Sequence, residues 1–272
     1  MTALTTKSPI RLLQITDTHL YGNPVGTLLK MNTQNSFGHV INSLKQNNDY
    51  YDLILATGDI AQDASPEAYE YFKSIMKDLG APFRWIPGNH DVLETMQEVA
   101  EGTDACEKLV QINNWQILFL DTSVLGQVHG NLTQEELEFL EQSLQAAQAD
   151  ESVSHCIICL HHNPVKGNAG WMKDIGLNNG VQFFKIVSKF EKLRCIIYGH
   201  IHQDLDFIYE GIRCLCTPST CIQFKPYVTD FTLDKENPGY RTFQLAEDGT
   251  IDTEVVRVTG FKFEADFTSE GY

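Results

Sequence analysis

The chain has 272 residues, 42% of them hydrophobic and 21% charged, which is the composition of an ordinary globular protein. Its formal net charge of −16 argues against nucleic acid or an anionic membrane as a partner, because both require a basic protein face. A small anionic substrate stays compatible with this charge, since bound divalent cations would reverse its sign locally.

The cysteines, the N-terminal residues and the lengths of the apolar runs bear on the cellular compartment of the protein. The seven cysteines lie mostly inside apolar runs, which favours buried, reduced thiols. Cys156 and Cys159 have CxxC spacing, but they fall within an expected strand, so we favour a buried strand over a redox pair or zinc knuckle. No signal segment is visible in residues 1–9, and no apolar run is long enough to span a bilayer. We therefore expect a cytoplasmic protein.

Apolar runs and helical periodicity alternate along the chain. We find no repeat or linker and expect one domain over residues 1–272, with tails at residues 1–9 and about 260–272. Ser65, Pro66 and Gly80 bound one helix clearly, and Thr133 with Glu136 forms a capping box at the start of another. In chain order we expect a strand at 10–16, a loop at 21–35, a helix at 36–46, a strand at 51–57, a helix at 66–79, a strand at 82–86, a helix at 93–106, a strand at 115–120, a helix at 132–149, a strand at 155–160, a loop at 165–177, a helix at 178–190, a strand at 194–198, and hairpins at 208–217 and 242–258.

Five of these strands end directly in residues that can bind a metal or move a proton. Strands that each feed a helix form a mostly parallel sheet, whose carboxyl ends share one edge. Six of the nine histidines fall at these ends, counting His162, which unrelated core histidines would not be expected to do. The residues at the five ends are Asp17 and His19; Asp59; Asn89, His90 and Asp91; His161; and His200 and His202.

The donor set predicts two metal ions. Four histidines, two aspartates and one asparagine are too many ligands for one tetrahedral zinc. Imidazole favours iron, manganese, zinc or cobalt over calcium or magnesium. Asp59, alone on its loop, is the expected bridging ligand, while His90 and Asp91 stay off the metals and Asp91 orients His90. Two ions about 3.5–4 Å apart can clamp an in-line displacement at phosphorus, with a bridging hydroxide as nucleophile.

The motifs Asp17-x-His19, Gly58-Asp59, Gly88-Asn89-His90-Asp91, His161 and Gly199-His200-x-His202 resemble, in this order, the signature of the calcineurin-like metallophosphoesterases. Stretches such as LQITDTHL, ATGDIAQD, GHIHQ and the terminal SEGY are similar to bacterial class III 3′,5′-cyclic AMP phosphodiesterases. The resemblance runs from Arg11 to Tyr272, which is nearly the whole chain.

This resemblance implies an α/β (α+β) fold, a four-layer αββα sandwich of two mixed β-sheets flanked by helices. It also implies hydrolysis of cyclic AMP to 5′-AMP with two ions, often Fe²⁺ and Mn²⁺. We expect this reaction to lower intracellular cyclic AMP, and we expect a monomer or small homo-oligomer. By position, His161 rather than His162 is the ligand, because it directly follows its strand. The implied ligands are Asp17, His19, Asp59 and His202 for one ion, and Asp59, Asn89, His161 and His200 for the other; the implied substrate contacts are His19, Asp59, Asn89, His90 and His202.

The expected catalytic residues are His90, which would protonate the leaving O3′, and Asp91. For the base pocket, the candidates are Trp171, Phe224 and residues 217–223, with core packing an equal alternative for each. Three other functions compete with a cyclic AMP phosphodiesterase. The first is a broad phosphodiesterase for other cyclic nucleotides or phosphodiesters. A non-enzymatic scaffold would predict broken motifs, and a nuclease would need a basic groove.

Overall fold

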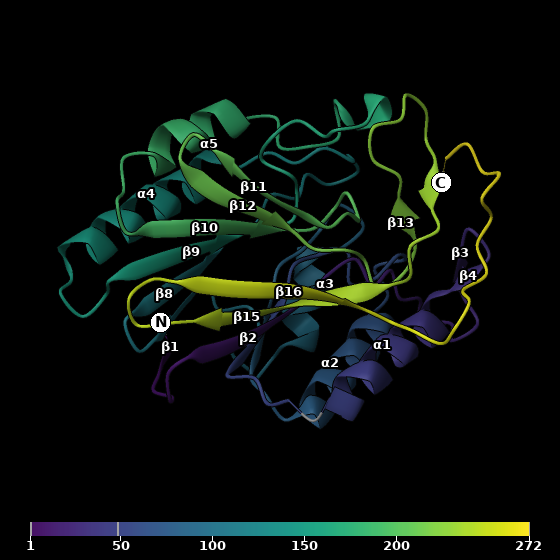
Figure 1. Ribbon diagram of the computed structural model, residues 1–272, viewed down its shortest axis with the longest axis horizontal. Coiled ribbons are helices and arrows are strands. Elements are labelled where there is room, and N and C mark those ends of the chain that lie inside the picture. Colours follow the sequence, from purple (N-terminus) through teal and green to yellow (C-terminus); the bar gives the residue numbers. More distant parts are fainter. Residues whose placement is uncertain (1, 48, 272) are drawn as a thin grey trace.

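The structure is a computed structural model that describes residues 2–47 and 49–271, so Met1 and Tyr272 of the expected tails lie outside the described part. Two β-sheets pack against each other at its centre (Figure 1). The larger sheet contains, in spatial order, β1 (Thr2–Leu4), β7 (Leu109–Ile112), β8 (Trp115–Phe119), β9 (His155–Cys159), β10 (Leu193–Tyr198), β12 (Ile212–Cys216) and β11 (Leu205–Tyr209). The smaller sheet contains β16 (Ile251–Arg257), β15 (Gly239–Leu245), β2 (Ile10–Ile15), β5 (Leu53–Ala56) and β6 (Phe83–Trp85).

Helices cover the outer face of each sheet. The apolar sides of α1 (Thr33–Asn47), α2 (Pro66–Leu79) and α3 (Leu93–Val99) pack on the smaller sheet. Those of α4 (Gln134–Ala149) and α5 (Gly180–Val187) pack on the larger one. A third apolar layer, which includes Leu12, Phe119 and Phe243, fills the space between the sheets. The four-layer αββα sandwich and its two mixed sheets are therefore confirmed.

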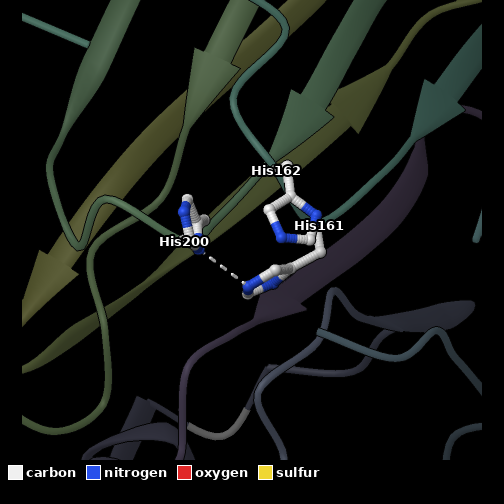
Figure 2. Close-up of side chains that lie close together, drawn as sticks. All are labelled: His161, His162 and His200. Carbon is white, nitrogen blue, oxygen red and sulfur yellow. Dashed lines mark hydrogen bonds between the residues drawn. The ribbon is translucent and has the colours of Figure 1, made fainter. Parts of the chain in front are cut away.

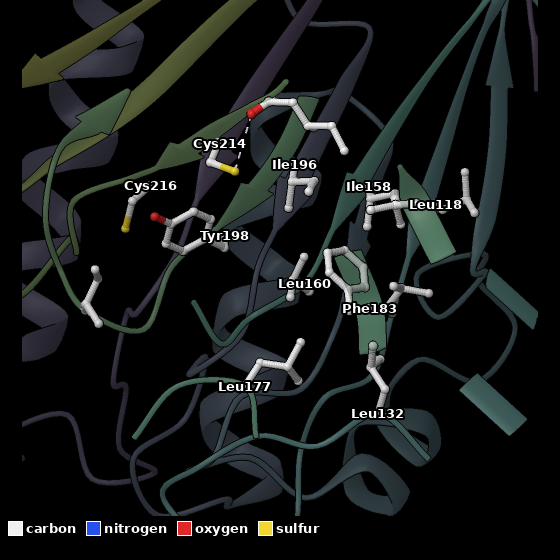
Figure 3. Close-up of a cluster of buried hydrophobic side chains, with 14 of the residues drawn as sticks. Leu118, Leu132, Ile158, Leu160, Leu177, Phe183, Ile196, Tyr198, Cys214 and Cys216 are labelled. Carbon is white, nitrogen blue, oxygen red and sulfur yellow. Dashed lines mark hydrogen bonds between the residues drawn. The ribbon is translucent and has the colours of Figure 1, made fainter. Parts of the chain in front are cut away.

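The continuous apolar runs follow from this layering, because successive residues of a strand face opposite sides and both sides are covered. Leu118, Ile158 and Ile196 are paired in register across three neighbouring strands. Their side chains face the helical layer, where Phe183 of α5 covers them (Figure 3). Their neighbours in sequence, such as Ile157, face the other sheet.

The direction of the strands determines where the polar residues at their ends lie. In the smaller sheet β2, β5 and β6 are parallel, and in the larger sheet β8, β9, β10 and β12 are parallel. The smaller sheet is closed on one side by the antiparallel hairpin of β15 and β16. The expectation of a single sheet edge is therefore replaced by two edges, one from each sheet, that meet at the site described below.

Most expected elements are present, with differences at their ends. The helix at 66–79 is confirmed at both ends, although the Ser65 side chain makes no capping hydrogen bond. Thr133 accepts a hydrogen bond from the Glu136 amide as predicted, whereas the Glu136 carboxylate pairs with Lys108. The helix expected at 36–46 begins earlier, at Thr33, and the helix expected at 93–106 ends at Val99.

Several elements were not expected. Residues 2–4, assigned to a tail, form β1 and pair in parallel with β7, so that part of the prediction is wrong. The loop expected at 21–35 contains the short pair β3 (Thr27–Leu28) and β4 (Met31–Asn32), and a second short pair is formed by β13 (Gln223–Phe224) and β14 (Leu233–Asp234). Residues 258–271 form no helix or strand. None of the helices in the described residues combines the length and hydrophobicity needed to cross a membrane.

Candidate active site

The loops after β2, β5, β6, β9 and β10 converge at the edge where the two sheets meet, and they carry every residue predicted for the site. Their backbones are unusual. A positive φ is uncommon outside glycine and costs energy, so it tends to occur where a site requires it. The candidate residues in this conformation are Asp17 (φ 54°), His19 (45°), Asp59 (49°), His200 (69°) and His202 (47°).

Glycines allow these loops to approach one another closely. A Cβ atom on Gly88 would lie 2.1 Å from Asp59 Oδ1, and one on Gly58 would lie 2.4 Å from His161 Nδ1. A Cβ on Gly199 would lie 2.5 Å from Asp17 Oδ2. The glycines that precede the polar residues in three of the motifs are therefore required by packing at the site.

One group of donor atoms gathers around Asp17, His19 and His202. Asp17 Oδ1 lies 3.3 Å from His202 Nε2, and the Nε2 atoms of His19 and His202 face each other at 3.1 Å. Asp59 Oδ2 lies 3.8 Å from His19 Nε2. All four side chains are buried.

A second group shares Asp59 with the first. The Oδ2 atom of Asp59 lies 3.3 Å from His161 Nε2. This nitrogen of His161 is also 3.3 Å from Asn89 Oδ1 and 3.2 Å from His200 Nδ1. The other oxygen of Asp59 accepts a hydrogen bond from the His90 amide at 2.9 Å, which holds the carboxylate in place. Asp59 Oδ2 thus lies between the two groups, where a bridging ligand would have to be.

Hydrogen bonds set the tautomers of the four histidines. In each ring, the nitrogen that points away from the cluster faces an oxygen that can only accept a hydrogen bond, so that nitrogen carries the proton. These contacts are His19 Nδ1 to Gln62 Oε1 (2.6 Å), His161 Nδ1 to Thr57 O (2.8 Å), His200 Nε2 to Ile175 O (2.8 Å) and His202 Nδ1 to Ile222 O (2.8 Å). In the neutral rings, the inward nitrogens therefore present lone pairs to one another, an arrangement that a cation between them would stabilise. This is how metal-binding histidines are normally held.

His162 lies beside this cluster and is buried, with its ring 4.6 Å from that of His200 (Figure 2). Both of its nitrogens have protein partners, Thr122 Oγ1 at 2.7 Å and the Val128 carbonyl at 3.2 Å. His161 instead directs Nε2 at His200, as the dashed line in Figure 2 shows. The geometry therefore supports the choice of His161 over its neighbour.

The hydrogen bonds of Asp91 join neighbouring loops of the site. Its carboxylate accepts hydrogen bonds from the amides of Ile60, Ala61 and Gly88 at 2.8–3.1 Å and from the Tyr69 hydroxyl at 3.0 Å, which joins the loops after β5 and β6. The contact to His90 Nδ1 comes from Gln62 Nε2 at 3.1 Å.

Gln62 thus contacts both His19 and His90, a role that the sequence analysis missed. Because its amide oxygen accepts from His19, its NH₂ group faces His90 and leaves the proton of that ring on Nε2. Nothing in an isolated glutamine marks it for this role.

Burial and the two carboxylates determine the charges of the site. Burial lowers the pKa of His19 and of His200 to about 3, so both rings are neutral, as metal ligands must be. Burial also acts on His161, but the Asp59 carboxylate outweighs it and raises the pKa to about 9. Burial opposes a charge on Asp59, yet His161 and His90 hold the pKa of that carboxyl well below its ordinary value.

A cavity of about 310 Å³ opens beside the donor groups, within the range of small-molecule sites. It is lined by Asn89, His90 and His200 together with the aromatic side chains of Trp171, Phe224 and Phe231. The Trp171 ring lies 5.0 Å from both phenyl rings.

The two predicted aromatic candidates for the base pocket therefore reach the cavity. Residues 217–223 do not line it, and they contact the metal-site loops instead. Among them, the Ser219 hydroxyl donates to the Asp17 carbonyl at 2.6 Å. For residues 217–223, which are buried and do not line the cavity, the structure therefore favours the core-packing alternative.

Known proteins are similar to this chain in sequence or in fold. The family model described as calcineurin-like phosphoesterase matches residues 10–204. The chain is 41% identical over 265 residues to a protein of Escherichia coli (strain K12) named 3′,5′-cyclic adenosine monophosphate phosphodiesterase CpdA, covering 97% of this chain and 95% of that protein. A protein of the same name from Pseudomonas aeruginosa is 39% identical over 267 residues, covering 98% and 97%. Among solved structures, a dimetal phosphatase from Danio rerio has the same fold, with a TM-score of 0.64 at 13% identity over 93% of this chain and 100% of that one.

Proposed function

The chain belongs to the calcineurin-like phosphoesterase family, and from that premise we propose that it hydrolyses 3′,5′-cyclic AMP to 5′-AMP. In a cell, this reaction would lower cyclic AMP. The observation that carries the proposal is the position of Asp59 Oδ2 between two groups of inward-facing donors, next to a cavity with an aromatic wall. The relatives named above support cyclic AMP as the substrate.

Two divalent ions fit the donor set. Four groups of three side chains have possible donor atoms that all lie within 4.8 Å of one another: Asp17, His19 and His202; Asp17, Asp59 and His161; His19, Asp59 and His90; and His161, His162 and His200. We infer that Asp17, His19, Asp59 and His202 hold one ion, and that Asp59, Asn89, His161 and His200 hold the other. When bound, such ions lower the pKa of a water molecule and neutralise charge on phosphate oxygens. The mixture of imidazole and oxygen donors favours Fe²⁺ or Mn²⁺, with Zn²⁺ or Co²⁺ as alternatives.

His90 is the proposed general acid. It lines the cavity and lies close to His19 and Asp59, but it is not among the ligands inferred above, and the amide of Gln62 leaves a proton on its Nε2 atom. A proton donated from this nitrogen to O3′ would neutralise the charge that develops as the P–O3′ bond breaks. Such a transfer is typically worth 10²–10⁴-fold in rate. Asp91 contributes by holding the loop that carries His90.

The protein also has to position the nucleoside. Trp171, Phe224 and Phe231 provide aromatic surfaces next to His90 and His200, and bases stack well on such surfaces. The phosphate would then lie at the donor end of the cavity and the base at the aromatic end.

One experiment tests the proposal directly. The purified chain is stripped with a chelator, reconstituted with Fe²⁺, Mn²⁺, Zn²⁺ or Co²⁺ singly, and assayed with cyclic AMP, cyclic GMP and bis(p-nitrophenyl) phosphate. We expect no turnover without metal, restoration by at least one ion, 5′-AMP as the product, and the highest kcat/KM for cyclic AMP.

Two results would overturn parts of this proposal. Full activity in the chelated protein would exclude metal-dependent hydrolysis. Equal kcat/KM values for the three substrates would instead favour the broad phosphodiesterase. Metal analysis of Asp59→Asn tests the bridge separately, because loss of the shared ligand should reduce the occupancy of both sites.

A further inference from the structure

The segment of residues 258–271, named here the C-terminal strap, crosses the molecule without forming a helix or strand and ends beside the cavity. In Figure 1 it is the yellow trace that leaves β16, passes β3 and β4, and finishes near β13. At its start, the Val258 amide donates to the Pro238 carbonyl at 2.9 Å, and Asn237 Nδ2 donates to the Val258 carbonyl at 2.8 Å. Phe263, further along, packs against apolar layers on both sheets.

Asp266 attaches the middle of the strap to the loop between β3 and β4. Its amide donates to the Leu29 carbonyl at 2.8 Å, and its carboxylate forms an ion pair with Lys30 at 2.8 Å. The same carboxylate accepts hydrogen bonds from the amide and hydroxyl of Thr268. The hydrogen bond from Lys30 is the largest of the effects that lower the pKa of Asp266 to about 2, and those from Thr268 add to it. The carboxylate is therefore ionised at neutral pH.

A tight turn then directs the strap at the cavity. The Ser269 amide donates to the Asp266 carbonyl at 3.1 Å, and the Ser269 hydroxyl donates to the Gly271 carbonyl at 2.7 Å. Glu270 and Gly271 are thereby placed in the cavity wall, which also contains His90 and Trp171. A segment distant in sequence from the metal motifs thus completes the substrate cavity.

We propose that Glu270 is a specificity-determining residue whose carboxylate accepts a hydrogen bond from a neutral donor of the bound nucleoside, either the ribose 2′-OH or the amino group of the base. This inference rests on the proposed function. A carboxylate would repel the substrate phosphate, so its place in the wall suits the uncharged half of the substrate. That half binds where Trp171, Phe224 and Phe231 offer stacking surfaces. The strap therefore selects nucleosides rather than phosphodiesters in general.

The test compares Glu270→Ala with Glu264→Ala, a control at an exposed acid on the same strap that does not line this cavity. Both variants and the unmodified chain are loaded with metal and assayed with cyclic AMP and with bis(p-nitrophenyl) phosphate, which has no such donor. We expect Glu270→Ala to lower kcat/KM for cyclic AMP about tenfold, mainly through KM, because a hydrogen bond to a charged group that persists in the transition state contributes uniform binding. The aryl substrate and the control variant should be unaffected.

Two analogues identify the donor. If the ribose hydroxyl is the partner, the loss disappears with 2′-deoxy cyclic AMP; if the amino group is the partner, it disappears with the cyclic phosphate of purine riboside. A loss that is equal for all substrates, or no loss at all, would overturn the proposal for Glu270. If the unmodified chain hydrolyses the aryl substrate but not cyclic AMP, the proposed function fails instead, so the two failures are distinguishable.

Discussion

Gly88→Ala tests whether close packing of the loops determines the position of the shared carboxylate. The new Cβ atom would lie 2.1 Å from Asp59 Oδ1 and 2.4 Å from the Asp59 amide nitrogen, whereas real Cβ contacts are essentially never below 3.0 Å. The carboxylate must therefore move by about 0.9 Å, the difference between 3.0 and 2.1 Å. The Asp59 backbone, which the same Cβ atom would also contact, cannot move aside without a large cost in free energy.

A shift of this size matters because metal–ligand distances tolerate only about 0.2 Å. A misplacement of about 1 Å typically costs about 10²-fold in rate, and an overpacked site costs about 1–3 kcal/mol in stability. We therefore expect Gly88→Ala to bind fewer than two ions, to lose about 100-fold or more in kcat/KM, and to unfold at lower urea concentration.

The assays are elemental analysis, cyclic AMP turnover and urea unfolding. Gly38→Ala is the matched control, because a Cβ at that position in α1 meets no atom within 4 Å. Alanine favours a helix over glycine by about 1 kcal/mol, so the control should be fully active and slightly more stable. Normal metal content and turnover in Gly88→Ala would refute the packing argument.

Three further predictions follow from the site. His90→Ala should keep both ions, measured by elemental analysis, and lose about 10²–10⁴-fold in kcat, as expected for a general acid; normal turnover would exclude that role. Asp59 raises the pKa of His161 to about 9 in the metal-free protein. A protonated imidazole with a raised pKa stabilises the folded state. This contribution is fully present at a pH below the ordinary pKa of about 6.5, and it is lost as the pH rises through 9. The metal-free protein should therefore become less stable over this interval in urea titrations while its affinity for Mn²⁺ increases, because the ligand must be deprotonated; a flat metal affinity would contradict this. Trp171→Ala should raise KM for cyclic AMP about fivefold or more, the equivalent of a stacking contribution of about 1 kcal/mol, and unchanged kinetics would remove this residue from the base pocket. Tyr227→Ala, at an aromatic residue that is 81% exposed, is the control for that variant.

Residues with a local signature were predictable from the sequence. His161 directly follows an apolar run and Asp59 follows another after Gly58, and the direction of each strand then determines which edge of the sheet these residues reach. The layers of the fold were implied by the family resemblance, and the helix from Pro66 to Leu79 has recognisable signals at both ends.

The rest depends on contacts between distant segments. Gln62 reaches two histidines only because the loops after β2, β5 and β6 meet, and Asp91 follows His90 in sequence while its carboxylate serves backbone amides elsewhere. Glu270 lies in the terminal SEGY stretch, but that pattern gives it no role, and its position depends on the attachment of Asp266 about four residues earlier. Such roles are determined by tertiary packing, which periodicity and spacing do not encode.

The origin of the donor atoms has a mechanical consequence. Asp17, His19, Asp59 and Asn89 follow strands of the smaller sheet, whereas His161, His200 and His202 follow strands of the larger one. Ions bound by both sets of ligands would link the two sheets of the sandwich at one edge. Their binding energy would then also resist separation of the sheets, since any ligand of the native state alone adds to its stability. When metal is scarce, the protein would lose this stabilisation as well as its activity. The abundance of the protein in a cell would then depend on the metal supply of that cell.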